Sequence, residues 1–119
     1  MPFRVPRRAI TTLALSLAVM TLGACGEATG PNGEKIVKVE DDVFNPQTKT
    51  IAAAETVLWE WAGQNEHNVT WVDPSGVSNS PTQAAGTFTR SFANAGAFNY
   101  YCTIHGTATS GMRGSIVVQ

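Results

Sequence analysis

The sequence is poor in the residues that cross-link chains and bind metals: of 119 residues, two are cysteine and two are histidine. Long hydrophobic runs are also scarce. The longest, Ala9 to Leu22, is interrupted by Thr and Ser and falls short of the ~20 apolar residues that a membrane-spanning helix needs. Basic residues are few, eight against nine acids, for a formal net charge of −1. These shortages argue against a disulfide framework, a transmembrane anchor and a nucleic-acid-binding surface.

The first 24 residues are typical of an export signal. Three arginines precede the apolar run, which closes as Leu22-Gly23-Ala24-Cys25. A basic start, a short apolar stretch and small residues before a cut site predict a secretory signal peptide over residues 1–24. The closing residues resemble a bacterial lipobox, which implies cleavage before Cys25 and a lipid on its thiol. We therefore expect an exported, lipid-anchored protein of the periplasm or cell envelope, delivered by either the general or the twin-arginine route.

Removal of the signal changes the charge balance. Residues 25–119 keep five basic and nine acidic residues, for a net charge of −4. An acidic surface excludes nucleic acid as a partner and is compatible with a basic protein partner, although such a charge often serves solubility alone. Residues 25–34 are rich in Gly and lack large apolar side chains, which predicts a flexible tether. The folded domain is expected over residues 35–119.

From Lys35 onward the patterns favour β-strands. Alternating apolar residues and turn clusters predict strands over 35–40, 48–52, 55–61, 67–72, 87–92, 97–102 and 115–118. Seven short strands without a helical period indicate an all-β sandwich or barrel. Arg90 breaks the pattern of its strand, because it shares a face with Phe88 and Phe92, which indicates an edge strand or a bulge.

The C-terminal stretch brings three metal-binding residue types close together. Alternation places Tyr100 and Cys102 on the inward face of one strand, and His105 follows in the adjoining loop. His67 also points inward, since it shares a strand face with Trp71. With Cys25 lipidated, Cys102 has no cysteine partner. An unpaired thiol is unusual in an oxidising compartment, which indicates that Cys102 is a ligand. Each residue alone is more often a packing residue, but their coincidence at strand ends predicts a metal site.

Copper suits these residues better than other metals. Two imidazoles, one thiolate and the thioether of Met112 are the donor set of blue copper sites. Structural zinc sites generally use four strong ligands in paired short spacings, and only one C-x₂-H unit is present. Acidic residues, which hard cations prefer, are absent near Cys102 in the sequence.

The domain resembles the cupredoxins of the plastocyanin, pseudoazurin and halocyanin kind. The resemblance covers residues 35–119 and rests on Phe44-Asn45-Pro46, Glu55-Thr56-Val57-Leu58-Trp59, Glu66-His67-Asn68-Val69, Gly96-Ala97-Phe98-Asn99-Tyr100-Tyr101-Cys102, Cys102-Thr103-Ile104-His105, Gly111-Met112-Arg113-Gly114 and Ser115-Ile116-Val117-Val118. It implies a Greek-key β-sandwich of about seven to eight strands.

The resemblance also implies a ligand set. His67, Cys102 and His105 would be the equatorial ligands of one type 1 copper ion, and Met112 would be the axial ligand. The backbone N–H of Asn68 would donate to the cysteine sulfur. The sequence departs from plastocyanin-like patterns in one respect, because six residues instead of the usual four separate His105 from Met112. This longer loop either folds outward and returns Met112 or leaves a weaker fourth ligand.

The expected function is electron transfer without catalysis. Such a copper site rearranges little between its two oxidation states. By the resemblance, His105 beside Ile104 would be the electron port to transient redox protein partners, and the protein would be a monomer. Two alternatives remain: a copper-binding or copper-storage lipoprotein without a fast redox role, and a metal-free Ig-like structural module. A storage protein would be favoured by a Met-rich or His-rich tract, but residues 25–119 contain Met112 alone.

Overall fold

Eight β-strands build the fold in the computed structural model, which describes Pro2 and residues 26–73 and 77–119. The strands are β1 (Lys35–Glu40), β2 (Val43–Asn45), β3 (Thr48–Ile51), β4 (Thr56–Trp61), β5 (Thr70–Trp71), β6 (Thr87–Ser91), β7 (Gly96–Gly106) and β8 (Gly111–Val118). Pro2 apart, the predicted signal peptide and Cys25 lie outside the described residues.

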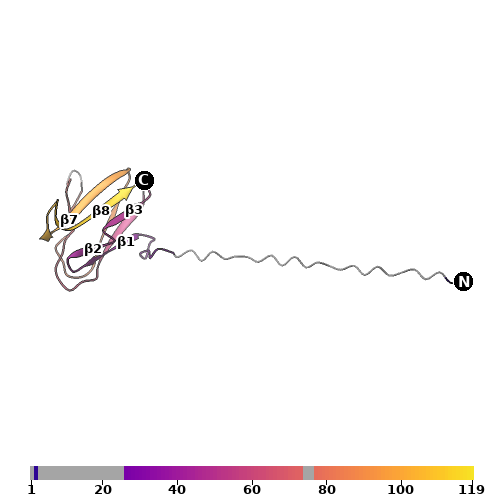
Figure 1. The fold of residues 1–119 in the computed structure, drawn as a ribbon, viewed down its shortest axis with the longest axis horizontal. Coiled ribbons are helices and arrows are strands. Elements are labelled where there is room, and N and C mark those ends of the chain that lie inside the picture. The colour runs from indigo at the N-terminus through magenta and orange to yellow at the C-terminus, as the bar shows by residue number, and fades with distance from the viewer. Residues whose placement is uncertain (1, 3–25, 74–76) are drawn as a thin grey trace.

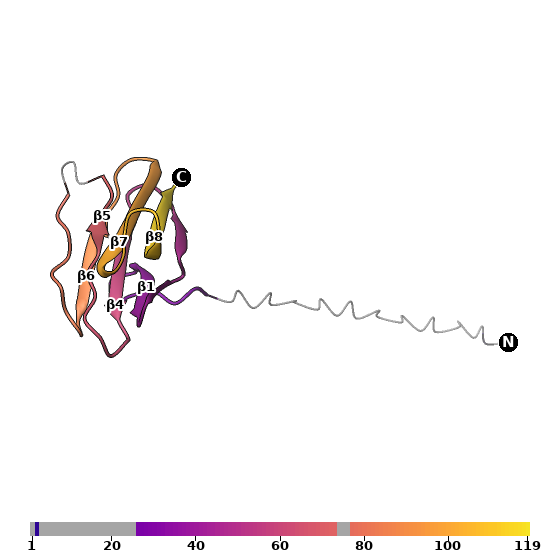
Figure 2. The ribbon, with the colours of Figure 1, turned by 60° about the vertical axis from the view of Figure 1, so that its left-hand side comes forward.

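The strands form two four-stranded sheets that pack face to face. The first sheet has the order β2-β1-β4-β6, and the second has the order β3-β8-β7-β5. In Figure 2 the first sheet can be followed through β6, β4 and β1, and the second through β5, β7 and β8. Both sheets are mixed, because β1 pairs with β4 and β3 pairs with β8 in parallel, while the remaining pairs are antiparallel. The predicted all-β sandwich of seven to eight strands is confirmed.

The core is aromatic and lies between the two sheets. Trp59 of β4 contacts Trp71 of β5 and Tyr100 of β7 edge to face, with ring centroids 5.7 and 5.5 Å apart. All three side chains are almost wholly buried. Edge-to-face pairs of this kind stabilise a core beyond the area that they bury. A few large rings therefore fill the interior of a small domain.

Three predicted strand boundaries were wrong. The segment 67–72 is a strand only over Thr70–Trp71, because His67 pairs with Gln83 in an isolated bridge instead. The strand predicted to end at residue 102 continues to Gly106, and β8 begins at Gly111 rather than at residue 115. The two strands thus form one long hairpin (Figure 1). The short β2 had no prediction, since it has three residues and only its middle one is buried.

Arg90 lies in an edge strand, as its broken pattern indicated. β6 is the outer strand of its sheet. The Arg90 guanidinium stacks on the rings of Trp71, Phe92 and Phe98, at 4.2, 4.5 and 5.1 Å from the ring centroids. A planar cation gains electrostatic attraction on such rings and covers them from water.

Residues 26–34, the predicted tether, lie against the domain. The Glu27 carboxylate pairs with the ammonium group of Lys49, whose side chain is only 5% exposed. Thr29 forms a bridge with Lys35, and the Gly33 N–H donates to the Gly30 carbonyl at 3.0 Å. Across residues 26–73 and 77–119, no helix is long and apolar enough to cross a membrane.

Candidate metal centre

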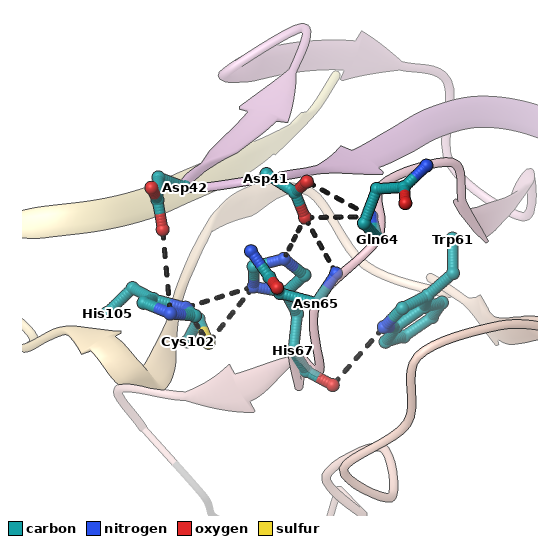
Figure 3. Close-up of polar contacts among 8 residues, drawn as sticks. All are labelled: Asp41, Asp42, Trp61, Gln64, Asn65, His67, Cys102 and His105. Carbon is teal, nitrogen blue, oxygen red and sulfur yellow. Dashed lines mark hydrogen bonds and ion pairs between the residues drawn. The ribbon is translucent and has the colours of Figure 1, made fainter.

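Three donor atoms converge, two from Cys102 and His105 and the third from His67, which lies 35 positions before Cys102 (Figure 3). The Nδ1 atoms of His67 and His105 lie 3.1 Å apart. The sulfur of Cys102 lies 3.8 Å from each of them. His67 and Cys102 are fully buried, whereas the His105 side chain is 28% exposed. The structure thus assembles the three residues that the sequence predicted to share a site.

His67 is fixed through its backbone. Its N–H donates to the Gln83 carbonyl and its own carbonyl accepts from the Gln83 N–H, both at 3.0 Å. The indole Nε1–H of Trp61 also donates to the His67 carbonyl, at 3.2 Å. These bonds engage only the backbone of His67, so its imidazole remains available to the site. Its ring therefore enters the site from a rigid support.

The segment between Cys102 and His105 is shaped by Asn68. The pairing of β7 with β8 is irregular between Tyr101 and Gly106, the stretch that carries Cys102 and His105. The Asn68 side chain accepts from the Thr103 N–H at 3.0 Å and donates to the Thr103 hydroxyl at 2.8 Å. Asn68 thus ties the segment of His67 to that of the cysteine. The expected donation from the Asn68 backbone N–H to the Cys102 sulfur stays a prediction.

The long loop after His105 folds outward and returns Met112 to the interior. Gly106 pairs with Gly111, and the Thr107 N–H donates to the Ser110 carbonyl at 2.8 Å, which closes a tight hairpin. Gly111 has a φ of +75°, a left-handed conformation that favours glycine. Met112 follows directly, 2% exposed, in the same buried cluster as Cys102. The two extra loop residues are therefore accommodated outside the domain.

Two acidic residues that the sequence analysis did not assign to the site face the histidines from outside (Figure 3). Asp41 Oδ1 lies 3.1 Å from Nε2 of His67, and Asp42 Oδ1 lies 3.5 Å from Nε2 of His105. The hydrogen bond from the Asn65 N–H, with further bonds from the His67 ring and the Gln64 N–H, lowers the pKa of Asp41 below its ordinary value of 3.8. The search for acids near Cys102 along the sequence missed these residues, because they belong to the β1–β2 turn.

The donor set fits a soft or borderline metal ion. A point equidistant from the three donor atoms lies about 2.1 Å from each, close to common metal–imidazole (~2.0–2.1 Å) and metal–thiolate (~2.3 Å) bond lengths. The two carboxylates favour hydrogen on Nε2 of each ring. Two unprotonated Nδ1 atoms would then face each other at 3.1 Å, an arrangement that a cation between them stabilises.

Known proteins share this sequence pattern and fold. The sequence model described as copper-binding proteins of the plastocyanin/azurin family matches residues 33–119. A plastocyanin from Scenedesmus fuscus is 33% identical over an alignment of 90 residues, and the match covers 65% of this chain and 87% of that protein. A purple cupredoxin from Nitrosopumilus maritimus has a TM-score of 0.59 at 22% identity, covering 71% of this chain and 98% of its own. A reduced amicyanin variant has a TM-score of 0.63 at 22% identity, covering 76% and 86%.

Proposed function

Because the chain belongs to the plastocyanin/azurin family of copper-binding proteins, we propose that it carries single electrons on one copper ion held by His67, Cys102, His105 and Met112. The observation that carries the proposal is the convergence of one sulfur and two Nδ1 atoms within 4.8 Å of one another. Copper supplies the one-electron couple when bound. The residues of the chain control the access of a redox partner to the copper site and limit the movement of the site between oxidation states.

The arrangement of the ligands supports electron transfer without substrate chemistry. His67 and Cys102 are fully buried and Met112 is 2% exposed, so the protein shields three of the four proposed ligands from water. Their backbones lie in strands or are tied to them by hydrogen bonds, which limits movement between oxidation states. Small rearrangement favours fast outer-sphere transfer. We therefore assign the protein no enzymatic activity.

His105 is the proposed electron port. Its side chain is 28% exposed, and the adjacent Ile104 is 50% exposed, so an apolar surface lies next to the one ligand that reaches solvent. A redox partner docked there needs no opening of the core. Contacts of redox partners are usually small and short-lived, which suits a carrier that must release its partner after each transfer.

The proposed place of action is the cell envelope. The N-terminal pattern of residues 1–24 supports export, and the lipobox-like ending supports lipidation of Cys25. The domain would then act as a monomer close to a membrane surface and serve transient protein partners there. Metabolic labelling with a radioactive fatty acid tests this part, since Cys25→Ala should abolish incorporation while the wild type is labelled.

The copper site is tested by loading residues 26–119 with Cu(II) and recording visible absorption and EPR spectra. An intense blue thiolate-to-copper band with narrow hyperfine splitting is expected, and Cys102→Ser should abolish it. The matched control is Ser91→Ala, which removes an exposed hydroxyl that shares a hydrogen bond with the Thr56 hydroxyl at 2.6 Å and leaves the four proposed ligands intact. A colourless wild-type protein at full copper loading would contradict the proposal.

A further inference from the structure

The two carboxylates of the β1–β2 turn differ from ordinary surface acids in what they touch. Each faces the Nε2 edge of a histidine whose Nδ1 edge faces the Cys102 sulfur. We infer that Asp41 is a positioning residue, which holds the His67 ring so that Nδ1 points at the metal and makes that nitrogen a stronger donor. This inference rests on the proposed copper site, and it gives Asp41 a part in setting the copper affinity and the reduction potential of that site.

Asp41 is itself held rigidly. Its carboxylate accepts from the Asn65 N–H at 2.9 Å and from the Gln64 N–H at 3.0 and 3.1 Å. Gly63 permits this close approach, because a Cβ at that position would lie 2.8 Å from the Asp41 backbone nitrogen and would also overlap its carboxylate. The segment 63–65 therefore wraps the carboxylate and fixes it in place. A rigid acceptor can orient an imidazole, whereas a mobile one cannot.

The contact selects one state of the His67 ring. A carboxylate accepts a hydrogen, so Nε2 carries the hydrogen and Nδ1 presents its lone pair to the site. Rotation of the ring by half a turn would direct a carbon toward Asp41 and lose this bond. The ring is fully buried, so water cannot replace the lost partner. Asp41 therefore favours the orientation and the tautomer that metal binding requires.

Asp42 makes the weaker contact of the two. The Asp42 carboxylate is 3.5 Å from Nε2 of His105, and the Asp42 side chain is 71% exposed. The Asp41 carboxylate is 3.1 Å from Nε2 of His67, and the Asp41 side chain is 35% exposed. Water screens an exposed pair and offers the ring another acceptor. We therefore expect the effect on the site to be concentrated in Asp41.

A carboxylate behind a ligating imidazole raises the basicity of that ligand, and loss of such partners typically costs 10- to 100-fold in metal affinity. The effect is greater for Cu(II) than for Cu(I), because the doubly charged ion gains more from a stronger donor and from a nearby negative charge. Asp41 should therefore lower the reduction potential. If a variant loses ten times more affinity for Cu(II) than for Cu(I), its one-electron reduction potential rises by about 59 mV.

Two variants separate charge from geometry. Asp41→Asn keeps an oxygen that can accept from Nε2–H and Asn65 N–H but removes the charge, whereas Asp41→Ala removes both. Glu40→Gln is the matched control, since it removes one charge from the residue that directly precedes Asp41, at the end of β1, and Glu40 contacts Asn45 rather than a proposed ligand. Copper-loaded proteins are compared by voltammetry, competition for Cu(II) and EPR, and thermal unfolding of the metal-free forms identifies any variant that fails to fold.

The expected order of reduction potentials is wild type, Glu40→Gln, Asp41→Asn and Asp41→Ala, from lowest to highest. Asp41→Ala should bind Cu(II) 10- to 100-fold more weakly and show altered copper hyperfine splitting. If Asp41→Ala does not fold, the potential of Asp41→Asn relative to Glu40→Gln decides. A blue wild type whose Asp41 variants match Glu40→Gln in potential and affinity would overturn this inference and leave the proposed function intact. A wild type without a blue band would overturn both.

Discussion

The Nδ1 atoms of His67 and His105 lie 3.1 Å apart although 38 positions separate the two residues in the chain. The first is carried by a segment bridged to Gln83, and the second follows Cys102 at the irregular end of the β7–β8 pairing. The sandwich brings the two segments together, so that the imidazole of His67 lies beside both the Cys102 sulfur and the His105 ring.

Met112 allows a direct test of the fourth ligand. Met112→Leu keeps the volume and should cost less than ~1.5 kcal/mol of stability. It removes a weak donor, so the blue band should persist while the reduction potential rises. Met112→Gln offers an oxygen donor and should lower the potential. Voltammetry of the two copper-loaded variants and the wild type provides the comparison, and equal potentials in all three would show that Met112 only packs.

Gly114 is required by the ring of Tyr100 on the neighbouring strand. The two residues face each other in the β7–β8 register, and a Cβ on Gly114 would overlap the phenol ring. Gly114→Ala should therefore destabilise the domain by about 1–3 kcal/mol through overpacking. Urea unfolding measures the loss.

The matched test of this clash is a double-mutant cycle. Tyr100→Leu removes the ring, so Gly114→Ala should cost much less in that background than in the wild type. Additive losses would show that the effect of Gly114 arises elsewhere, since independent sites add within a few tenths of a kcal/mol.

The hydroxyl of Tyr100 has no hydrogen-bond partner among the described residues, and burial raises the pKa of Tyr100 above its ordinary 10.0. Tyr100→Phe should therefore be neutral or stabilising at pH 7. The folded state resists ionisation of this group while the unfolded state does not, so the wild type loses stability as the pH rises above 10.

The advantage of Tyr100→Phe should accordingly grow in alkali. Urea unfolding at pH 7 and at about pH 10.5 measures both values, the upper pH lying just above the ordinary tyrosine pKa. Tyr101→Phe is the control, because Tyr101 is only partly buried. A Tyr100→Phe variant that is much less stable at pH 7 would point to a hydrogen bond that the hydroxyl makes in solution.

Substitution of Glu27 should destabilise the domain more than substitution of its ion-pair partner Lys49. Lys49→Met removes a buried ammonium and leaves a largely exposed carboxylate that water solvates. Glu27→Gln leaves the buried ammonium without its counter-charge and should lower the unfolding temperature more. The hydrogen bond from Lys49 lowers the pKa of Glu27 below 4.5, so its contribution is present above pH 4.5 and is lost as the pH falls through the lowered value.

Thermal unfolding at pH 7 and at pH 3 checks this pair, since about pH 3 lies below the ordinary carboxyl pKa. The difference between wild type and Glu27→Gln should shrink at the lower pH, because the protonated acid resembles the amide. Equal losses for both variants at pH 7 would mean that residue 27 does not pack against Lys49 in solution.

The convergence of His67, Cys102 and His105 could be predicted from the sequence, because strand alternation and short spacing place such side chains. Alternation along one strand places Cys102 beside Tyr100 in the core, and the three-residue step to His105 returns a second ligand to the same end. The contact of Asp41 could not be predicted in this way. It lies 26 positions from His67, and an acid in a turn is usually solvated, so only the packing of the β1–β2 turn over the site reveals it.

Electron self-exchange between copper-loaded molecules measures whether the proposed copper site exchanges electrons rapidly. Proton NMR lines of residues near the site are followed in mixtures of the Cu(I) and Cu(II) forms at increasing protein concentration. We expect concentration-dependent broadening of these lines, from fast transfer between molecules whose sites hardly rearrange. Cu(I) lines that stay sharp in the presence of the Cu(II) form at every concentration would contradict it and indicate a protein that holds copper without a fast redox role.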